Sequence, residues 1–201
     1  MGQAFAATVW HDAHAFLKPC CMIANGLWWA RGRVKAFVAD QLTAAHGPKL
    51  AFYTGWEEWV GLPLLGLPSL KAKVDTGART SALHATDIAP YLQNGDAFVA
   101  FKVHPVPRHP HIEVACTAPL LDQRIVTSSN GEPERRYVIA TDLEIGQHRW
   151  PIEISLTNRE GMRFRMLIGR RALQRGMLVD PSATFHQPRR SHKIYRQLIK
   201  P

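Results

Sequence analysis

The sequence Asp75-Thr76-Gly77 is the pattern in this chain with the clearest chemical meaning. Apolar residues alternate before it at Leu70, Ala72 and Val74, as expected for a buried strand that ends at the aspartate. The glycine would allow close backbone approach and a positive φ angle, and the threonine hydroxyl could brace the turn. Two carboxylates brought into contact share one proton, so a pair of such aspartates would supply one base and one acid. Direct attack of water on a peptide bond needs that combination.

A second apolar strand is expected at Met166–Ile168, and it ends in Gly169-Arg170. A short helix is expected over Arg170–Arg175, ended by Gly176. The Asp-Thr-Gly triplet alone has roughly a 4% chance of occurring in a chain of this length, so a plain turn held by an Asx-type bond from Asp75 is an alternative. The apolar strand before the aspartate and the second pattern favour the catalytic interpretation.

Three longer blocks carry a resemblance to a known family. They are GWEEWV at Gly55–Val60, KAKVDTGARTSALHA at Lys71–Ala85 and FRMLIGR at Phe164–Arg170. In this order they resemble the retropepsin-like aspartic proteases, and in particular a bacterial branch often labelled "ATP-dependent zinc protease". That branch is associated with ligases that add glutamates to a small-subunit ribosomal protein. The resemblance extends from about Gly55 to Pro181.

The resemblance implies a fold and a set of site residues. The fold would be mainly β, a closed retropepsin-like acid-protease barrel with one short C-terminal helix. It also implies one catalytic aspartate per chain, and the sequence has no second Asp-Thr-Gly or Asp-Ser-Gly. An active enzyme would then be a symmetric homodimer that brings two Asp75 side chains together. By the resemblance, the catalytic residues are Asp75, Thr76 and Gly77, and the substrate-binding residues are Ala78, Arg79, Ile168, Gly169 and Arg170.

Arg79 departs from many retropepsins, which carry a small or acidic residue at that place, although the related branch also has a basic one. If its cation points inward, it would stabilise negative charge on the Asp75 carboxylates. The alternative is an arginine that faces solvent or pairs with Glu57, Glu58 or Asp87.

The zinc and ATP labels find little support in the sequence. It contains neither a His-Glu-x-x-His pattern nor a Gly-x-x-x-x-Gly-Lys-Ser/Thr loop. Prolines interrupt the one loose group of metal-ligating side chains, and Cys20-Cys21 has no partner pair at the spacing of a zinc site. We therefore expect no cofactor and no metal. The loose group consists of His104, His109, His111 and Cys116.

Short strands with frequent turns are predicted from residue 51 to about residue 180. Prolines in this part favour turns and edge strands over helices, and Gly146-Gln147 indicates a hairpin turn. The stretch Ser128–Gly131 is either the mobile hairpin that covers substrate in this fold or an ordinary turn. The expected strands include 71–74, 98–103, 112–115, 137–145 and 150–156.

The chain divides into three predicted parts, of which residues 51–181 form the protease domain. Residues 1–50 are predicted to be a weakly structured or helical extension, with a pattern compatible with a helix over 29–45. Residues 182–201 are predicted to be a poorly ordered basic tail. Residues 159–201 contain eleven Lys or Arg against two Asp or Glu, so their net charge of +9 equals that of the whole chain. This asymmetry favours either an acidic partner or a solvated tail.

Composition excludes several classes of protein. Hydrophobic residues make up 46% of the chain and charged residues 20%, which is enough to build a core and excludes global disorder. No apolar stretch reaches the roughly 18 residues of a spanning helix, so no membrane partner is expected. Three cysteines, two of them adjacent, do not make a disulfide framework and favour a reducing, cytoplasmic compartment.

Three functions follow from these patterns. The first is an aspartic endopeptidase on protein or peptide substrates, with acidic or glutamylated tails as candidates and a functional link to a glutamate ligase and a ribosomal protein. The second is a non-catalytic binding module of the same fold that recognises an acidic or ribosomal partner. The third is an RNA- or ribosome-binding protein that uses the basic C-terminus, which the lack of ordered aromatic and basic motifs disfavours.

Overall fold

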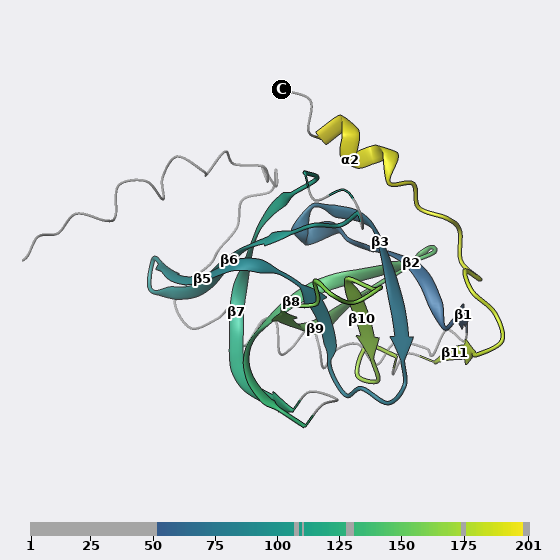
Figure 1. Ribbon diagram of the computed structural model, residues 1–201, viewed down its shortest axis with the longest axis horizontal. Helices are drawn as coiled ribbons and strands as arrows, with labels where there is room; N and C mark the ends of the chain where they lie inside the picture. Colours follow the sequence, from purple (N-terminus) through teal and green to yellow (C-terminus); the bar gives the residue numbers. More distant parts are fainter. Residues whose placement is uncertain (1–51, 107–108, 110, 128–130, 174–175, 199–201) are drawn as a thin grey trace, which may run out of the picture.

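The computed structural model describes residues 52–106, 109, 111–127, 131–173 and 176–198 (Figure 1). The predicted extension 1–50, with its helix over 29–45, lies outside the described residues. The elements in chain order are β1 (Phe52–Gly55), β2 (Glu57–Leu62), η2 (Pro63–Leu65), β3 (Leu67–Asp75), β4 (Ser81–His84), β5 (Thr86–Gln93), β6 (Asp96–Val103), β7 (Val114–Thr127), β8 (Pro133–Ile145), β9 (His148–Thr157), β10 (Met166–Gly169), β11 (Met177–Asp180) and α2 (Lys193–Leu198).

Six of the strands close into a barrel. Their order is β2-β3-β10-β4-β9-β8, and β8 pairs back onto β2 through Val60 with Ile145 and Gly61 with Glu144. Closure gives each of these strands a hydrogen-bonded neighbour on both sides, which removes free edges from the ring. The predicted fold, a mainly β closed barrel, is confirmed. Among the described residues, no helix has the length and apolar character needed to cross a membrane.

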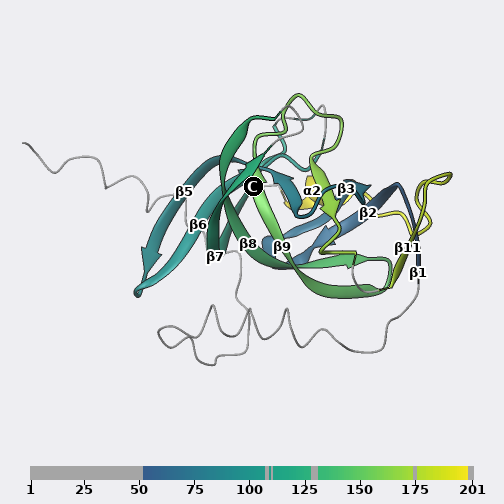
Figure 2. The same ribbon diagram turned by 90° about the horizontal axis from the view of Figure 1, so that it is seen from below.

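The sheet continues beyond the barrel as an antiparallel arm. β7 pairs with the first half of β8, on the edge opposite β9, and β6 and β5 follow outward from it (Figures 1 and 2). β7 and β8 form the long hairpin that contains Ser128–Gly131; residues 128–130 lie outside the described part, and Gly131 has a φ of 83°.

Most of the predicted strands are confirmed, with one shifted start. Residues 98–103 lie in β6, 137–145 in β8 and 150–156 in β9. Gly146 makes the β8–β9 turn with a φ of 59°. The strand expected at 112–115 begins only at Val114, because the Ile112 N–H donates to the His109 carbonyl in a turn instead.

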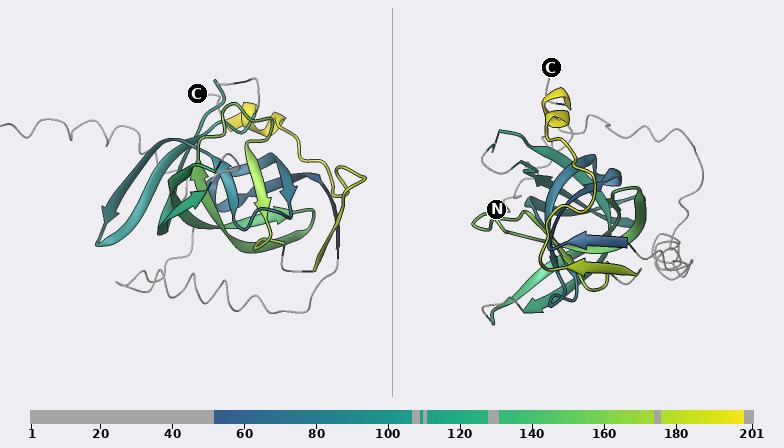
Figure 3. Two further views of the ribbon diagram at one scale, coloured as in Figure 1. Left: turned by 60° about the horizontal axis from the view of Figure 1, so that its bottom comes forward. Right: turned by 90° about the vertical axis from the view of Figure 1, so that its right-hand side faces the viewer.

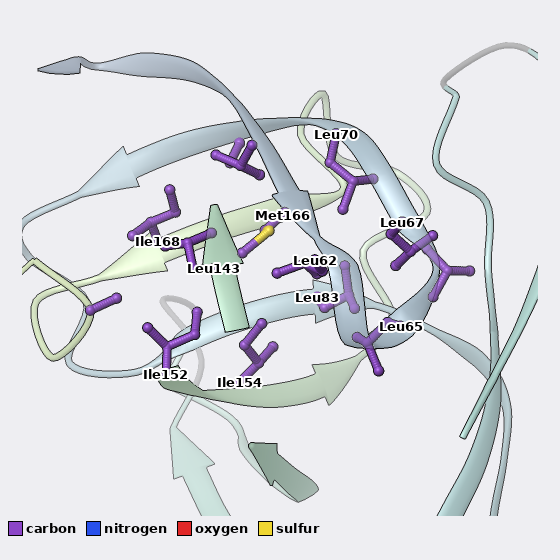
Figure 4. Packing of buried hydrophobic residues seen from close by; sticks show 14 of the residues in the cluster. Leu62, Leu65, Leu67, Leu70, Leu83, Leu143, Ile152, Ile154, Met166 and Ile168 are labelled. Atoms are coloured by element: carbon purple, nitrogen blue, oxygen red, sulfur yellow. The ribbon is translucent and has the colours of Figure 1, made fainter. Parts of the chain in front are cut away.

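The barrel interior is filled by aliphatic side chains. The predicted alternation on β3 holds, since Leu70, Ala72 and Val74 are buried while Lys71 and Lys73 lie on the other face. Figure 4 shows leucine and isoleucine side chains from most of the barrel strands converging with Met166 on one interior. Burial of large aliphatic groups at roughly 1.5–3 kcal/mol each is the main source of stability for such a core.

The helix expected at Arg170–Arg175 is wrong for its described residues. Arg170–Leu173 form tight turns, in which the Ala172 N–H donates to Gly169 O and the Leu173 N–H to Arg170 O. Gly176, with a φ of 78°, does end this segment as predicted, and β11 begins directly after it. The N–H groups of Arg170 and Arg171 donate to Ala78 O and Arg79 O, which ties the segment to the turn after Asp75. The C-terminal helix is α2 instead.

The C-terminal segment 181–198 differs from the poorly ordered tail that we expected. It runs from β11 along the outside of β1, β2 and β3 to α2 (Figure 3). Glu58, with no exposed surface, accepts backbone N–H groups from Gly55, His186 and Gln187. A buried carboxylate with three such donors is well compensated for the loss of water. Charge counting could not detect this attachment, because it depends on two buried side chains, Glu58 and Tyr195.

Tyr195 ties α2 to the barrel. Its side chain is fully buried, and its hydroxyl donates to Ser69 O at 2.6 Å and accepts the Ser69 N–H at 3.0 Å. One phenol thus satisfies both backbone groups of a residue in β3.

We expect Tyr195→Phe to lower the free energy of unfolding by about 1–3 kcal/mol, because it leaves a buried N–H and a buried C=O without partners. Urea denaturation of the full chain measures the change. Tyr53→Phe is the matched control, since Tyr53 is 60% exposed. Equal effects of the two substitutions would contradict the anchoring role of Tyr195.

Candidate active site

Asp75 is the last residue of β3, and it lies beside Gly169, the last residue of β10. The two strands run parallel, with Ile168 opposite Val74 and Gly169 opposite Asp75. β10 also pairs antiparallel with β4 on its other side. The two motifs that the sequence singled out therefore lie next to each other at one end of the same two strands (Figure 1).

The Asp75 carboxylate is oriented by its own turn. Oδ1 accepts the Gly77 N–H at 3.0 Å and the Ala78 N–H at 3.1 Å. Oδ2 lies 3.9 Å from Lys73 Nζ, and 28% of the Asp75 side chain is exposed. Charge-assisted bonds of this kind fix an acceptor in direction, whereas the exposed lysine contributes little. One carboxylate oxygen is therefore held by the turn, and the side chain remains accessible.

Two expected roles within the turn differ in the structure. Gly77 does not have a positive φ. The lack of a side chain lets its backbone approach the Asp75 carboxylate closely, because an added Cβ would lie 3.2 Å from Asp75 Oδ1. Thr76 is exposed, and the brace of the turn is the Asp75 carboxylate rather than the threonine hydroxyl. The Asx-type bond considered as an alternative is thus present, and it orients the carboxylate.

Gly169 holds the aspartate turn from the other strand. An added Cβ would lie 2.6 Å from Thr80 C and 2.7 Å from Thr80 O, so the turn packs directly on the glycine backbone. The Gly169 N–H donates to Ser81 Oγ at 3.2 Å. The next two residues continue the contact, since the Arg170 N–H donates to Ala78 O and the Arg171 N–H to Arg79 O.

The remaining predicted site residues divide into two groups. Arg79 and Arg170 are exposed beside the turn, and Ala78 and Gly169 contact it through their backbones. Ile168 is fully buried in the barrel core (Figure 4), so it supports the site by packing. Substrate contact by these five residues stays a prediction.

The acids suggested as partners of Arg79 are engaged elsewhere. Glu57 pairs with Lys71 and Arg163. Glu58 binds backbone N–H groups, as described above, and Asp87 pairs with Lys102. Arg79 is therefore an exposed cation four residues after Asp75, and within one chain it matches the alternative in which it faces solvent.

Sequence reasoning gave little weight to His84, which organises the neighbouring loop. Its ring Nδ1 accepts the Arg159 N–H at 2.9 Å, and its backbone N–H donates to Arg165 O at 2.7 Å. Burial first, and then the Arg165 cation, lower the pKa of His84 to about 4. The ring is therefore neutral at pH 7, as an acceptor must be. Its presence in the block Lys71–Ala85 was the available signal.

The loose group of metal-ligating residues does not form a centre. Cys116 is buried and its thiol lies 3.3 Å from Leu65 O, and burial raises the pKa of this thiol to about 12. His104 lies nearer to Glu113 and His84. Within the described ranges, no three His, Cys, Asp or Glu side chains are grouped to hold a metal ion.

Comparison with known proteins agrees with this geometry. A family model described as "RimB-like: Retropepsin-like aspartic endopeptidase RimB" matches residues 53–190. The chain belongs to the RimB-like family. The matched range includes the Asp75 turn, β10 and the first part of the C-terminal segment, up to Arg190.

Several curated relatives share the same region. A "Probable alpha-L-glutamate ligase" of Shewanella halifaxensis is 47% identical over 134 residues, which are 67% of this chain and 29% of that protein. One of Desulfotalea psychrophila is 43% identical over 128 residues, 64% of this chain and 28% of that protein. The match therefore spans less than a third of the length of these relatives.

A solved structure shares the fold. It is protein Lpg0085 of Legionella pneumophila, of unknown function, with a TM-score of 0.58 and 27% identity. The match covers 68% of this chain and 98% of that one.

Gly169→Ala should displace the Asp75 turn, because its methyl group would overlap the Thr80 backbone. We expect a loss of about 1–3 kcal/mol in the free energy of unfolding, the usual cost of overpacking. Gly161→Ala is the control, since a Cβ there has no neighbour within 4 Å. Denaturant unfolding of both variants measures the difference, and an unchanged Gly169→Ala protein would contradict the packing described.

Proposed function

We propose that this chain is an aspartic endopeptidase that works as a homodimer, with a water molecule activated between the two Asp75 carboxylates. The observation that carries the proposal is the Asp75 carboxylate itself, oriented by two N–H groups at the end of β3 and braced from Gly169. Membership of the RimB-like family supports it. Each chain supplies one such aspartate, so the acid–base pair needs a second copy.

The proposed chemistry follows from two carboxyl groups that share one proton. The ionised group accepts a proton from water as the oxygen attacks the peptide carbon, and the protonated group donates its proton to the carbonyl oxygen. The tetrahedral diol then collapses: the C–N bond breaks, the leaving nitrogen takes up a proton from the pair, and one diol hydroxyl returns its proton to the pair as the new C=O forms. The dyad returns to its starting state with one shared proton.

Acidic peptides are the substrate class that we propose. Lys73, Arg79 and Arg170 surround the Asp75 turn and would attract negative charge. The relatives named as probable alpha-L-glutamate ligases contain a segment homologous to this chain, which supports a functional link to glutamate addition. Peptides rich in α-linked glutamate, including the tail of a ribosomal protein, would fit both observations.

Two cations of the C-terminal segment bind the barrel, so they are not free to attract an acidic substrate. Arg190 pairs with Glu144 and donates to Pro68 O, so it holds the segment to the barrel. Arg189 stacks on the Trp59 ring. The acidic-substrate proposal therefore rests on the cations near Asp75 rather than on the C-terminal segment.

Asp75→Asn should lower kcat on an unstructured glutamate-rich peptide by about 1000-fold or more, because the amide cannot exchange the proton. The thermal unfolding midpoint should change little. Asp142→Asn, which loses an exposed ion pair with Arg149, is the control and should keep its activity. EDTA should also leave activity unchanged.

Each contrary result has a defined meaning. Full activity in a folded Asp75→Asn protein would overturn the aspartic mechanism. Loss of activity in EDTA that zinc restores would favour a metal enzyme. Binding of the peptide without cleavage by the wild-type chain would favour the non-catalytic binding module.

A further inference from the structure

The loop between β9 and β10, residues 158–165, is fixed at both ends by one residue. His84 accepts the Arg159 N–H through its ring and donates its own N–H to Arg165 O. A tight turn inside the loop adds a bond from the Met162 N–H to Arg159 O at 3.0 Å. Figure 2 shows this loop joining the end of β9 to the start of β10. The position of Arg159 is therefore set by the barrel.

The Arg159 side chain is fixed as well. Its Nε donates to Phe164 O at 3.2 Å, and the residue is only partly exposed. This bond occupies one of the five guanidinium N–H groups and leaves the two terminal nitrogens for other acceptors. A partly buried fork of this kind can bind a carboxylate with two hydrogen bonds and little further loss of side-chain freedom.

The positive charge of Arg159 is not paired with a carboxylate of the described residues. Burial and the nearby Arg136 cation lower its pKa, while the charge of Asp75 acts in the opposite direction. No carboxylate of the described residues lies within ion-pair distance of Arg159, although Asp75 is near enough to act through its charge. The charge of Asp75 thus reaches this cation, which is held by His84 and Phe164 and still able to bind an anionic partner.

Six other arginines in the described part of the chain are paired with acids. The pairs are Arg124 and Arg171 with Glu153, Arg136 with Glu134, Arg149 with Asp142, Arg163 with Glu57 and Arg190 with Glu144. Within the same described residues, Arg79 and Arg170 share with Arg159 the lack of an ion pair, but both are exposed, whereas Arg159 is partly buried and held by Phe164 O.

We propose that Arg159 is a specificity-determining residue that binds a carboxylate side chain of the substrate next to the Asp75 pair, and that His84 is the positioning residue for it. The proposal rests on the proposed function, because it places the acidic side chain beside the bond to be cleaved. It assigns the preference for acidic peptides to one guanidinium rather than to the net charge.

Binding provides the first test and needs no catalysis. A fluorescent peptide with glutamate residues and its glutamine counterpart are titrated into Asp75→Asn protein, with Arg159→Gln or Arg149→Gln added. We expect Arg159→Gln to weaken binding of the glutamate peptide about tenfold and to leave the glutamine peptide unchanged. Arg149 pairs with Asp142 at the start of β9, away from the loop, so Arg149→Gln should change neither affinity.

Kinetics provides the second test. In the wild-type background Arg159→Gln should raise KM for the glutamate peptide more than it lowers kcat. His84→Asn keeps an acceptor for the Arg159 N–H and should retain the preference for glutamate, whereas His84→Leu should lose it. Thermal unfolding of each variant shows whether it folds. If a His84 variant fails to fold, the comparison of Arg159→Gln with the wild-type chain decides the proposal.

The outcomes separate this proposal from the proposed function. Equal loss of affinity for both peptides, no loss for either, or an equal fall in kcat on both would overturn the role of Arg159. The last of these would show that it acts on the charge of Asp75. Glutamate-dependent binding through Arg159 without any cleavage would keep this inference and overturn the peptidase.

Discussion

The position of the Asp75 carboxylate depends on one close backbone contact, between Gly169 and the turn that follows Asp75. β10 has four residues and lies between β3 and β4. Its last residue has no side chain, so the Thr80 backbone can rest against it, and the N–H groups of Arg170 and Arg171 bind the turn. Because β10 is pinned on both edges, the turn cannot move without disturbing the barrel. The turn that orients the Asp75 carboxylate is thereby fixed by the strands of the barrel.

The sequence predicted the elements that carry local signals. Alternation before Asp75 located β3, Gly146 located the β8–β9 hairpin, and the Asp-Thr-Gly and Ile-Gly-Arg motifs located the two halves of the site. Contacts between residues far apart in the sequence could not be predicted from local patterns. Glu58 binds His186 and Gln187, and Tyr195 binds Ser69, and both contacts turn an expected tail into part of the domain. The segment after β10, where a helix was expected, is also held by a distant contact, because Arg170 and Arg171 donate their N–H groups to Ala78 O and Arg79 O.

Net charge does not reveal which cations are already engaged by acids of the same chain. The chain carries a net charge of +9, and residues 159–201 alone carry the same net charge. In the structure Arg190 forms an ion pair with Glu144, and several other arginines of the barrel also form ion pairs with acidic side chains. Among the described cations that lack an acidic contact partner, Arg159 is the one that His84 and Phe164 fix in place.

The central claim is that one active site contains the Asp75 carboxylates of two chains. A heterodimer of one wild-type and one Asp75→Asn chain, isolated through two different affinity tags, tests it most directly. The specific activity of this heterodimer on a glutamate-rich peptide should fall to the level of the doubly substituted dimer, because neither chain can form the proton-sharing pair alone. A heterodimer that keeps about half of the wild-type activity would show that each chain holds a complete site, and would contradict the account.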